Sequence, residues 1–324
     1  MKKKALITGI SGFVGSHLAE LLLAENFEVH GIILWRSKTE NIDSFKKKLI
    51  LHDGDITDLS SLLKILKKVK PHYIFHLAGQ SLVSASWQSP AQTLYTNVIG
   101  TSNLLEAITN LKDKTFDPVV QIAGSSEEYG LVFSREIPIK ETNPLRPISP
   151  YGVSKVAEDM LALQHFRSYK IKTIITRAFN HSGPRRGEVF ATSTFAKQIA
   201  EIEKGLKKPV IYHGNLEAKR DFTDVRDIVR AYLLAVLKCK PGEVYNICSG
   251  KKGTFSIKEI LSILLSLTDV SVKLTKDTKR MRPSDTPSIL VGDHSKFSLI
   301  TGWKPTINIK KTLNDLLDYW RERV

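Results

Sequence analysis

Residues 9–15, Gly-Ile-Ser-Gly-Phe-Val-Gly, decide the fold because of what lies on either side of them. They follow a short apolar run at residues 5–8 and open an amphipathic helical pattern. In this strand–turn–helix context Gly9 permits a tight turn, Gly12 lets the backbone approach a pyrophosphate, and Gly15 allows the helix to pack closely on the strand. The start of the helix adds N–H donors and the positive end of its dipole. The stretch therefore predicts a dinucleotide site, although its GxxGxxG spacing also fits a plain structural turn.

Apolar and amphipathic runs alternate through residues 1–178. The apolar runs predict strands at Ala5–Thr8, Glu28–Leu34, Lys48–His52, Tyr73–Leu77, Val119–Ala123 and Lys172–Thr176. The amphipathic runs predict helices after Gly12 and at Leu59–Val69, Ala91–Thr109 and Tyr151–Tyr169. Alternation of this kind, with short connections, is typical of a parallel sheet with helices on both faces. We therefore expect an α/β fold with a Rossmann-type doubly wound parallel sheet.

The pattern changes after about residue 178, where loops lengthen and prolines interrupt the periodicity. Helices are predicted at Thr194–Lys204, Val225–Leu237, Ile257–Leu267 and Ile309–Glu322. Residues 179–324 are expected to form a smaller C-terminal α/β lobe that exchanges some strands or helices with residues 1–178. A ligand cleft is expected between the two lobes, at the carboxyl ends of the parallel strands.

The composition excludes several classes of protein. Of the 324 residues, 42% are hydrophobic and 25% charged, as in globular chains and unlike disordered or fibrous ones. No apolar run approaches the roughly 18 residues of a membrane span, and the stretch after the basic start is too short for a signal peptide. We therefore expect a cytoplasmic location and no membrane partner. The net charge of +15 favours anionic partners, but the lysines are scattered and no nucleic-acid-binding motif accompanies them. Solvated helix faces or phosphorylated small ligands explain this charge better than a nucleic acid.

The end of the second predicted strand bears on the choice of dinucleotide. A site selective for NAD places Asp or Glu there, to bind the ribose 2′-hydroxyl. This chain has Leu-Trp-Arg-Ser at residues 34–37, with no carboxylate, and Arg36 can pair with a 2′-phosphate. The pattern predicts NADP; the alternative is that Arg36 is a solvated loop residue. Asp55, after the third strand, is a candidate to receive the adenine amino group.

Two further patterns carry reactive groups. Tyr151 and Lys155 lie four residues apart on one helix face, where an ammonium stabilises a phenolate and pulls the pKa of the tyrosine towards neutrality. Such a tyrosine can act as a general base on a sugar hydroxyl. Ser125 and Glu127 follow the fifth predicted strand, so a hydroxyl and a carboxylate meet at the ligand edge of the sheet. The alternative for Glu127 is an exposed loop acid.

With these motifs, the chain resembles the extended short-chain dehydrogenases/reductases that act on nucleotide sugars. It is most similar to the GDP-mannose 4,6-dehydratases and the neighbouring GDP-4-keto-6-deoxymannose reductases. The elements of this resemblance span nearly the whole chain: GISGFVG, HDGDITD, HLAGQSLV, GSSEEYG, SPYGVSK, RAFNHSGPRRGE, GNLEAKRDFTDVRDIV, MRPSD and TGWKP. The resemblance implies an NADP-binding Rossmann domain at residues 1–178, a nucleotide-sugar-binding lobe at residues 179–324, and a homodimer or homotetramer.

The resemblance also implies roles for single residues. Ser125 corresponds to the Ser or Thr that binds the sugar 4-oxygen, Glu127 to the glutamate of dehydratases, and Tyr151 with Lys155 to the base and its activator. The expected cofactor-binding residues are Gly9, Gly12, Phe13, Val14, Gly15, Arg36, Asp55, Ile56, Leu77, Ala78, Gly79, Tyr151, Lys155 and His181. The expected substrate-binding residues are Gln80, Ser125, Asn180, Arg186, Asn215, Arg220 and Arg282. No metal site is expected.

Some features resemble one branch and some the other. Dehydratases of this kind usually carry Thr at the Ser125 position and a longer segment after the second strand, where this chain has the short stretch Arg36–Lys48. GSSEEYG also resembles the reductases, whereas PRRGE and GDITD resemble the dehydratases. Glu127, which a reductase does not need, favours an NADP-dependent GDP-mannose 4,6-dehydratase that forms GDP-4-keto-6-deoxymannose by internal hydride transfer. The alternatives are NADPH-dependent 4-reduction of that keto sugar, and another nucleotide-sugar epimerase or dehydratase.

Overall fold

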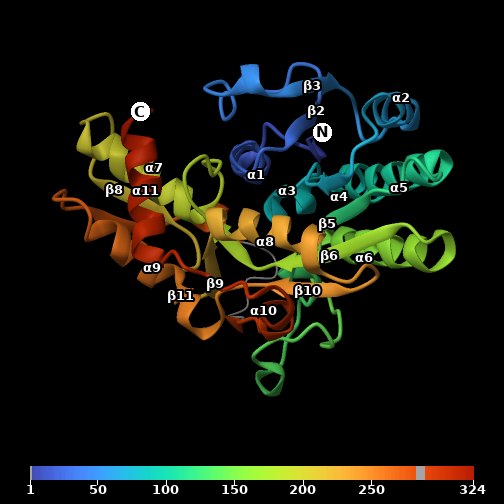
Figure 1. Cartoon of the computed structure of the whole chain (residues 1–324). Coiled ribbons are helices and arrows are strands. Elements are labelled where there is room, and N and C mark those ends of the chain that lie inside the picture. Colours follow the sequence, from blue (N-terminus) through green and yellow to red (C-terminus); the bar gives the residue numbers. More distant parts are fainter. Residues whose placement is uncertain (1, 282–288) are drawn as a thin grey trace.

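A parallel sheet of seven strands forms the centre of the part of the chain that the structure describes, residues 2–281 and 289–324 (Figure 1). In this computed structural model the strand order is β10-β6-β5-β4-β1-β2-β3, and every neighbouring pair is parallel. The strands are β1 (Lys4–Thr8), β2 (Glu28–Ile33), β3 (Ile50–Asp53), β4 (Tyr73–His76), β5 (Val119–Ser125), β6 (Lys172–Ala178) and β10 (Val244–Ile247). The order reverses between β1 and β4, so the expected doubly wound α/β fold is confirmed.

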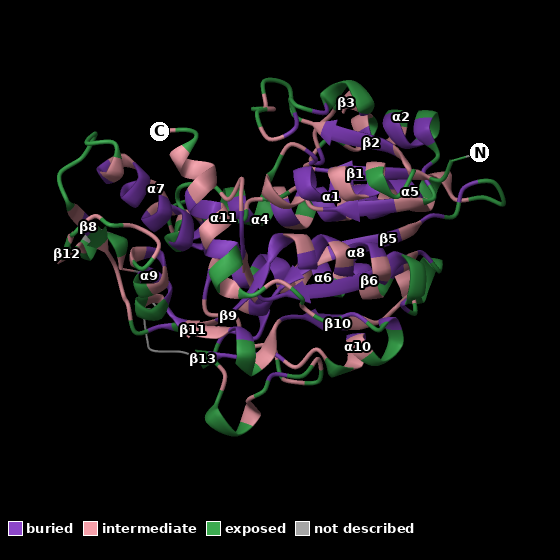
Figure 2. Cartoon of the chain, turned by 60° about the vertical axis from the view of Figure 1, so that its left-hand side comes forward, coloured by how far each residue is buried: buried purple, intermediate pink, exposed green. Residues whose placement is uncertain are grey.

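Helices cover both faces of this sheet, which is why its strands are continuous apolar runs. Successive residues of β1 point to opposite faces, so Ala5 and Ile7 belong to one core and Leu6 to the other. The helices of the first face are α1 (Phe13–Ala24), α8 (Val225–Lys238) and α10 (Ser295–Thr301). Those of the second face are α2 (Leu59–Val69), α5 (Gly100–Leu111) and α6 (Pro150–Tyr169). Figure 2 shows the sheet buried between these layers.

A second, smaller lobe lies at the left of Figure 1 and has its own core, formed by Phe195, Ile199, Ile260, Leu264 and Leu316 among others. Its helices are α7 (Ala191–Glu203), α9 (Ile257–Leu265) and α11 (Ile309–Arg321). One small sheet has the order β11-β9-β13, with β7 also paired to β9, and a second pairs β12 with β8. These strands are β7 (Asn180–Ser182), β8 (Val210–His213), β9 (Lys219–Asp224), β11 (Thr254–Ser256), β12 (Lys273–Lys276) and β13 (Ile289–Leu290).

The chain after residue 178 contributes to both lobes. β10 pairs with β6 in the central sheet, where Val244 lies opposite Ile175. α8 packs on α1, and Ile228 and Tyr232 of α8 belong to the same core as Leu18 of α1. The central sheet is therefore completed by a strand and two helices from the second half of the sequence. No helix of the described part of the chain is long and apolar enough to span a bilayer.

Two predicted elements differ in the structure. The third strand was expected from Lys48, but Lys46–Lys48 forms a 3₁₀ turn and β3 starts only at Ile50. The single helix expected at Ala91–Thr109 is divided into α4 (Pro90–Leu94), a π-helical turn η2 (Tyr95–Ile99) and α5. A π turn keeps the apolar face nearly continuous, so the periodicity alone does not indicate it. The preceding helix α3 (Val83–Gln88) is too short to show a helical period.

Candidate active site

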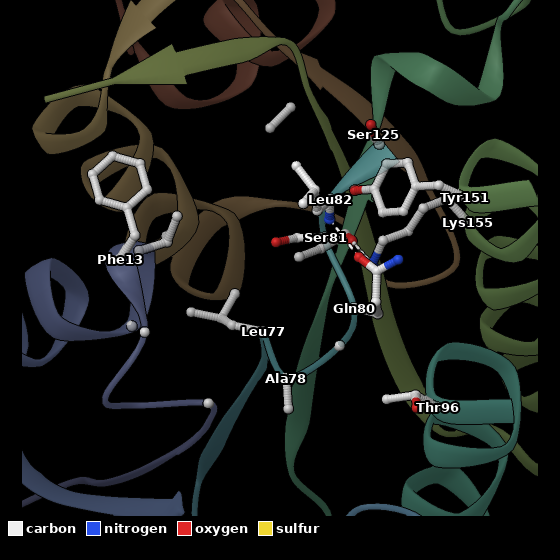
Figure 3. Close-up of a pocket in the computed structure, with 18 of the residues that line it drawn as sticks. Phe13, Leu77, Ala78, Gln80, Ser81, Leu82, Thr96, Ser125, Tyr151 and Lys155 are labelled. Carbon is white, nitrogen blue, oxygen red and sulfur yellow. Dashed lines mark hydrogen bonds between the residues drawn. The ribbon is translucent and has the colours of Figure 1, made fainter. Parts of the chain in front are cut away.

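A cavity of about 580 Å³ lies at the carboxyl edge of the central sheet, beside the reversal of strand order between β1 and β4. Its wall combines the turn after β1, the segment after β4, the end of β5 and the start of α6. Figure 3 shows Phe13 on one side and Tyr151 with Lys155 on the other, with the segment from Leu77 to Leu82 between them. This edge is where doubly wound sheets bind nucleotides.

The turn after β1 is closely packed around its glycines. Gly9 has a φ of +71°, and a Cβ on Gly15 would lie 2.3 Å from the Gly9 carbonyl oxygen. A side chain at either position would strain or displace the backbone. α1 begins at Phe13 directly after the turn, and Gly12, Phe13, Val14 and Gly15 all line the cavity. The free N–H groups of this first helical turn can therefore hold a pyrophosphate.

A buried hydrogen-bond chain fixes Leu77 and Ala78 at the bottom of the cavity. Thr8 Oγ1 accepts from the backbone N–H groups of both residues, each at 3.0 Å, and donates to His76 Nδ1 at 2.9 Å. His76 Nε2 in turn donates to Thr101 Oγ1 at 3.0 Å. Burial lowers the pKa of His76 to about 3, so the ring is neutral, as this arrangement requires. These hydrogen bonds hold Leu77 and Ala78, at the floor of the cavity, to β1 and α5.

The π-helical turn η2 has a clear role at this site. Asn97 Oδ1 accepts from the Gln80 N–H at 2.7 Å, and Asn97 Nδ2 donates to the Gln80 carbonyl at 3.0 Å and to Ser154 Oγ at 2.9 Å. π turns are frequent at functional sites because they move one side chain out of the helical register. Here Asn97 ties the Gln80 segment to α6, the helix that carries Tyr151 and Lys155.

α6 presents Tyr151 and Lys155 to the cavity, as their spacing predicts. The helix is capped directly before Tyr151, where Ser149 Oγ accepts from the Gly152 N–H at 3.0 Å. Both side chains are buried, and Lys155 Nζ lies 5.9 Å from the centroid of the Tyr151 ring. Burial raises the pKa of Tyr151 and outweighs the opposing effects of Lys155 and Ser125. The sequence predicted a lowered pKa for Tyr151. When only the protein's own groups act on the phenol, that prediction is wrong, because the sequence pattern does not reveal how deeply the phenol is buried.

Lys155 is held from behind by two acceptors. Its Nζ donates to the Ala123 carbonyl and to Glu158 Oε2, each at 2.9 Å. Burial acts to lower the pKa of Lys155, but Glu158 and Tyr151 outweigh it, and the pKa is raised. Burial raises the pKa of Glu158 to about 7 in spite of the neighbouring ammonium. The lysine therefore stays charged, and it is held by a buried carboxyl group that the YxxxK pattern did not predict.

A second cavity, of about 370 Å³, adjoins the first on the side of the second lobe. The residues that line both are Leu82, Glu127, Asn180, His181, Arg186 and Phe190. Glu127 is half-buried in this shared wall, and its backbone N–H donates to Ser125 Oγ at 3.2 Å. A hydroxyl, a phenol and a carboxylate therefore lie close to the junction of the two cavities, where a ligand that spans both would pass them.

Arg186 brings positive charge to the shared wall. Its guanidinium carbon lies 3.5 Å from the ring centroid of Phe190 and 4.9 Å from that of Phe13, and no carboxylate of the described residues pairs with it. Burial lowers the pKa of Arg186 to about 10, which leaves it protonated at neutral pH. The neighbouring His181 is stacked on Phe13, and burial lowers the pKa of His181 to about 4, so it is neutral. The arginine can therefore pair with an anion such as a diphosphate.

The structure brings most of the predicted site residues to these two cavities. Those that line the first are Gly9, Gly12, Phe13, Val14, Gly15, Asp55, Ile56, Leu77, Ala78, Gly79, Gln80, Ser125, Glu127, Tyr151, Lys155, Asn180, His181 and Arg186. Asn215 and Arg220 line the second. Arg36 is exposed and does not line the cavity, although its neighbour Ser37 does. The guanidinium carbon of Arg36 lies 4.2 Å from the centroid of the Trp35 ring. Arg282 lies outside the described residues.

Some wall residues were not predicted from the sequence. The first cavity also includes Ser37, Thr96, Phe190 and Tyr232, and the second includes Tyr212, His213 and Met281. These residues come from separate strands, helices and loops, so no local spacing connects them. Phe190 alone had a signal, since it lies two residues after the PRRGE motif.

Comparison with known proteins gives the family. A family model described as GDP-mannose 4,6 dehydratase matches residues 6–316. GDP-6-deoxy-D-mannose reductase from Pseudomonas aeruginosa is 33% identical over 324 residues, which cover 100% of this chain and 99% of that protein. GDP-mannose 4,6-dehydratase from Vibrio cholerae is 36% identical over 355 aligned positions, which cover 98% of this chain and 93% of that protein.

A solved structure extends the likeness to three dimensions. RMD from Pseudomonas aeruginosa, complexed with NADPH, is 32% identical to this chain and has a TM-score of 0.86, with 100% of both chains covered. The family match itself runs from β1 into α11, so it includes both lobes and both cavities. The chain therefore belongs to the GDP-mannose 4,6-dehydratase family of the extended short-chain dehydrogenases/reductases, and it is an enzyme.

Proposed function

We propose that this enzyme is a 4,6-dehydratase that converts GDP-mannose to GDP-4-keto-6-deoxymannose and uses NADP as its cofactor. The observation that carries the proposal is the position of Glu127, which lies with Ser125 and Tyr151 close to the junction of the two cavities. A dehydratase needs a carboxylate near its base to move a proton at C5. A 4-keto reductase has no use for that carboxylate.

NADP suits the first cavity. The glycine turn and the first turn of α1 offer backbone N–H groups to a pyrophosphate without side chains in the way. Residues 34–37 place Arg36, and no carboxylate, at the end of β2, which favours a 2′-phosphate. The similar RMD structure holds NADPH, which supports the same choice here. When bound, NADP⁺ would supply the acceptor for a hydride from C4 and the donor that returns it to C6.

The side chains divide the proton transfers between them. Tyr151 removes the proton of the 4-hydroxyl while Ser125 donates a hydrogen bond to the same oxygen, and the charge on Lys155 opposes the burial that otherwise keeps the phenol protonated. The 4-ketone that forms acidifies C5, and Glu127 takes the C5 proton. Glu127 then gives a proton to the 6-hydroxyl, which leaves as water. Return of the hydride to C6, and return to C5 of the proton that Tyr151 removed, after its exchange with solvent, would complete the 6-deoxy product and leave the cofactor as it began.

The second cavity provides for the nucleotide part of the substrate. Arg186 and Arg220 would pair with the diphosphate and Asn215 would contact the nucleotide, since all three line that cavity. No nucleic acid partner is proposed. Assembly as a homodimer or homotetramer, and a cytoplasmic location, remain predictions. Assembly is supported by exposed apolar side chains on adjoining helices: Leu94, Tyr95, Ile99, Val153 and Met160.

The second candidate is 4-reduction of GDP-4-keto-6-deoxymannose by NADPH. The observation in its favour is chain length: the reductase of Pseudomonas aeruginosa aligns over 324 positions, the length of this chain, whereas the Vibrio cholerae dehydratase needs 355. Reduction would use Ser125, Tyr151 and Lys155 in the same places and leave Glu127 idle.

Two incubations distinguish these candidates. The purified enzyme is given GDP-mannose with NADP⁺ in one, and GDP-4-keto-6-deoxymannose with NADPH in the other. We expect consumption of GDP-mannose in the first and little oxidation of NADPH in the second. Rapid NADPH oxidation with the keto sugar, and unchanged GDP-mannose, would establish the reductase instead.

Cofactor selectivity gives a separate prediction. Arg36→Ala should narrow the preference for NADP over NAD by about 1–3 kcal/mol, the scale of hydrogen bonds to a charged group. Affinities of both variants for both cofactors, measured by calorimetry, test this, with Arg135→Ala as a control at an arginine away from both cavities. Equal affinities of the wild-type enzyme for NADP and NAD would show that Arg36 confers no preference for NADP.

A further inference from the structure

A buried charge cluster lies directly behind the turn that carries Ser125 and Glu127, outside both cavity walls. Glu128 and Asp159 are fully buried, and Arg177 is 3% exposed. Arg177 Nε lies 2.9 Å from Glu128 Oε2, and Arg177 Nη2 lies 2.8 Å from Asp159 Oδ2. Both carboxyl groups lie over Gly124, where a Cβ would be 2.7 Å from Glu128 Oε1 and 3.2 Å from Asp159 Oδ1. Three ionisable groups therefore meet at one point below the reactive turn.

The charges of this cluster do not balance if every group is ionised. The two carboxylates would face one guanidinium, which leaves an uncompensated negative charge in a buried site. The guanidinium of Arg177 directs its donors at Asp159 and Tyr129 rather than at Glu128: Nε–H donates to Asp159 Oδ2 at 2.8 Å, and Nη1 donates to Tyr129 OH at 3.1 Å. Glu128 Oε2 and Asp159 Oδ1 are left buried with no hydrogen-bond donor among the described residues.

One proton placed between the two carboxyl groups resolves both problems. Both carboxyl groups contact Arg177 and lie over Gly124, and each acts on the other as a hydrogen-bond partner, so a proton on one can be donated to the other. It removes the surplus charge and supplies a hydrogen-bond donor between the two carboxyl groups. In agreement, burial together with the Asp159 charge raises the pKa of Glu128 well above its usual range, and burial raises the pKa of Asp159.

The same cluster grips the reactive turn. Glu128 Oε1 accepts from the Ser125 N–H at 2.6 Å and closes a capping box around the 3₁₀ turn η3 (Ser126–Glu128). Ser125 Oγ accepts from the Glu127 N–H at 3.2 Å within that turn. Any movement of the Glu128 carboxyl group therefore moves Ser125 and Glu127 relative to Tyr151.

We propose that Glu128 is a positioning residue: it shares a single proton with Asp159 at neutral pH, and this protonated pair, clamped by Arg177, holds Ser125 and Glu127 in their reactive geometry. The proposal rests on the proposed role of Ser125, which the dehydratase and the reductase have in common. Loss of the shared proton leaves two carboxylates on one guanidinium and loosens the turn. Both activity and local stability should therefore fall as the pH rises through the raised pKa of the pair.

Among the described residues, charged and titratable groups from three parts of the fold surround the pair. Burial raises the pKa of Tyr129, which therefore stays neutral, and Lys155 stays cationic on α6. The groups that face the pair are Lys155 and Glu158 on α6, Arg177 on β6, and Tyr129 and Glu141 on the chain between β5 and α6. Burial raises the pKa of Glu158 to about 7, but Glu158 accepts from Lys155 and does not contact the turn through a hydrogen bond among the described residues.

Two variants at one position test the proposal. Glu128→Gln keeps an acceptor for the Ser125 N–H and a permanent donor for Asp159, whereas Glu128→Met keeps only the size. Turnover, KM and thermal midpoint are measured from pH 6 to pH 10 on whichever of the two sugar reactions the wild-type enzyme catalyses. Glu128→Met should lower kcat about 10-fold, the scale of one lost strong hydrogen bond, with KM changed less than about threefold. Glu128→Gln should restore kcat to within about threefold of the wild type and should lose the alkaline fall in kcat and in thermal midpoint. Glu141→Gln, a neighbouring acid outside the pair, should keep the wild-type pH profile.

Two results would contradict the proposal. If kcat and the thermal midpoint of Glu128→Gln fall at alkaline pH as steeply as those of the wild type, Glu128 and Asp159 do not share a proton. If Glu128→Met has the same kcat as the wild type, Glu128 does not position Ser125 and Glu127. If the wild type turns over neither sugar, the proposed function fails, while the thermal midpoints of the wild type and Glu128→Gln against pH still decide whether the proton is shared.

Discussion

Tyr151→Phe is expected to lower turnover by about 10²–10⁴-fold while nucleotide-sugar binding is retained, because the ring stays and the titrating hydroxyl is lost. Tyr151 is 9% exposed and lines the first cavity, so removal of the whole ring would disturb packing, whereas loss of one oxygen would not. Steady-state rates and the affinity for the nucleotide sugar, measured on the same preparation, give the two halves of this result.

Tyr245→Phe is the matched control. Tyr245 is fully buried on β10 and belongs to the core, away from both cavities. Turnover of that variant should stay close to the wild type. A Tyr151→Phe enzyme that works at the wild-type rate would exclude Tyr151 as the base, whatever the reaction.

Glu127→Gln is expected to stop the reaction after the first hydride transfer. The amide keeps the shape of the side chain but cannot carry the C5 proton, while Ser125, Tyr151 and Lys155 still serve the oxidation at C4. The variant should therefore accumulate enzyme-bound NADPH, seen by its absorbance, without releasing 6-deoxy product. It should also fail to exchange the C5 hydrogen with deuterium from the solvent.

The same variant behaves differently in a reductase, whose chemistry does not involve C5. Glu127→Gln would then oxidise NADPH with the keto sugar at nearly the wild-type rate. Glu136→Gln is a useful control, because Glu136 pairs with Arg146 on the loop beyond the turn and lies outside both cavities.

The sheet and the cofactor turn were readable from the sequence because their signals are local. Continuous apolar runs predict strands buried on both faces, and the glycines of residues 9–15 are required by a positive φ at Gly9 and a 2.3 Å approach at Gly15. The YxxxK pair was equally local, since one helical turn brings Tyr151 and Lys155 to the same face.

The features that were missed depend on contacts between distant segments. Asn97 reaches Gln80 and Ser154 through a π turn whose residues look helical in the sequence. Arg177 joins Glu128 and Asp159 from β6, and neither carboxyl group shows in its own motif that it is buried. The pKa of Tyr151 was misjudged for the same reason, because depth of burial comes from the assembled fold and not from the spacing to Lys155.

The most direct test of the dehydratase proposal is product analysis of GDP-mannose incubated in deuterated water with the enzyme and substoichiometric NADP⁺. The proposed mechanism regenerates the cofactor in every cycle and passes the C5 proton through Glu127. We therefore predict complete conversion to GDP-4-keto-6-deoxymannose, with one solvent deuterium at C5 and no net NADPH. GDP-mannose recovered unchanged and without deuterium, from enzyme that reduces the keto sugar with NADPH, would contradict the proposal.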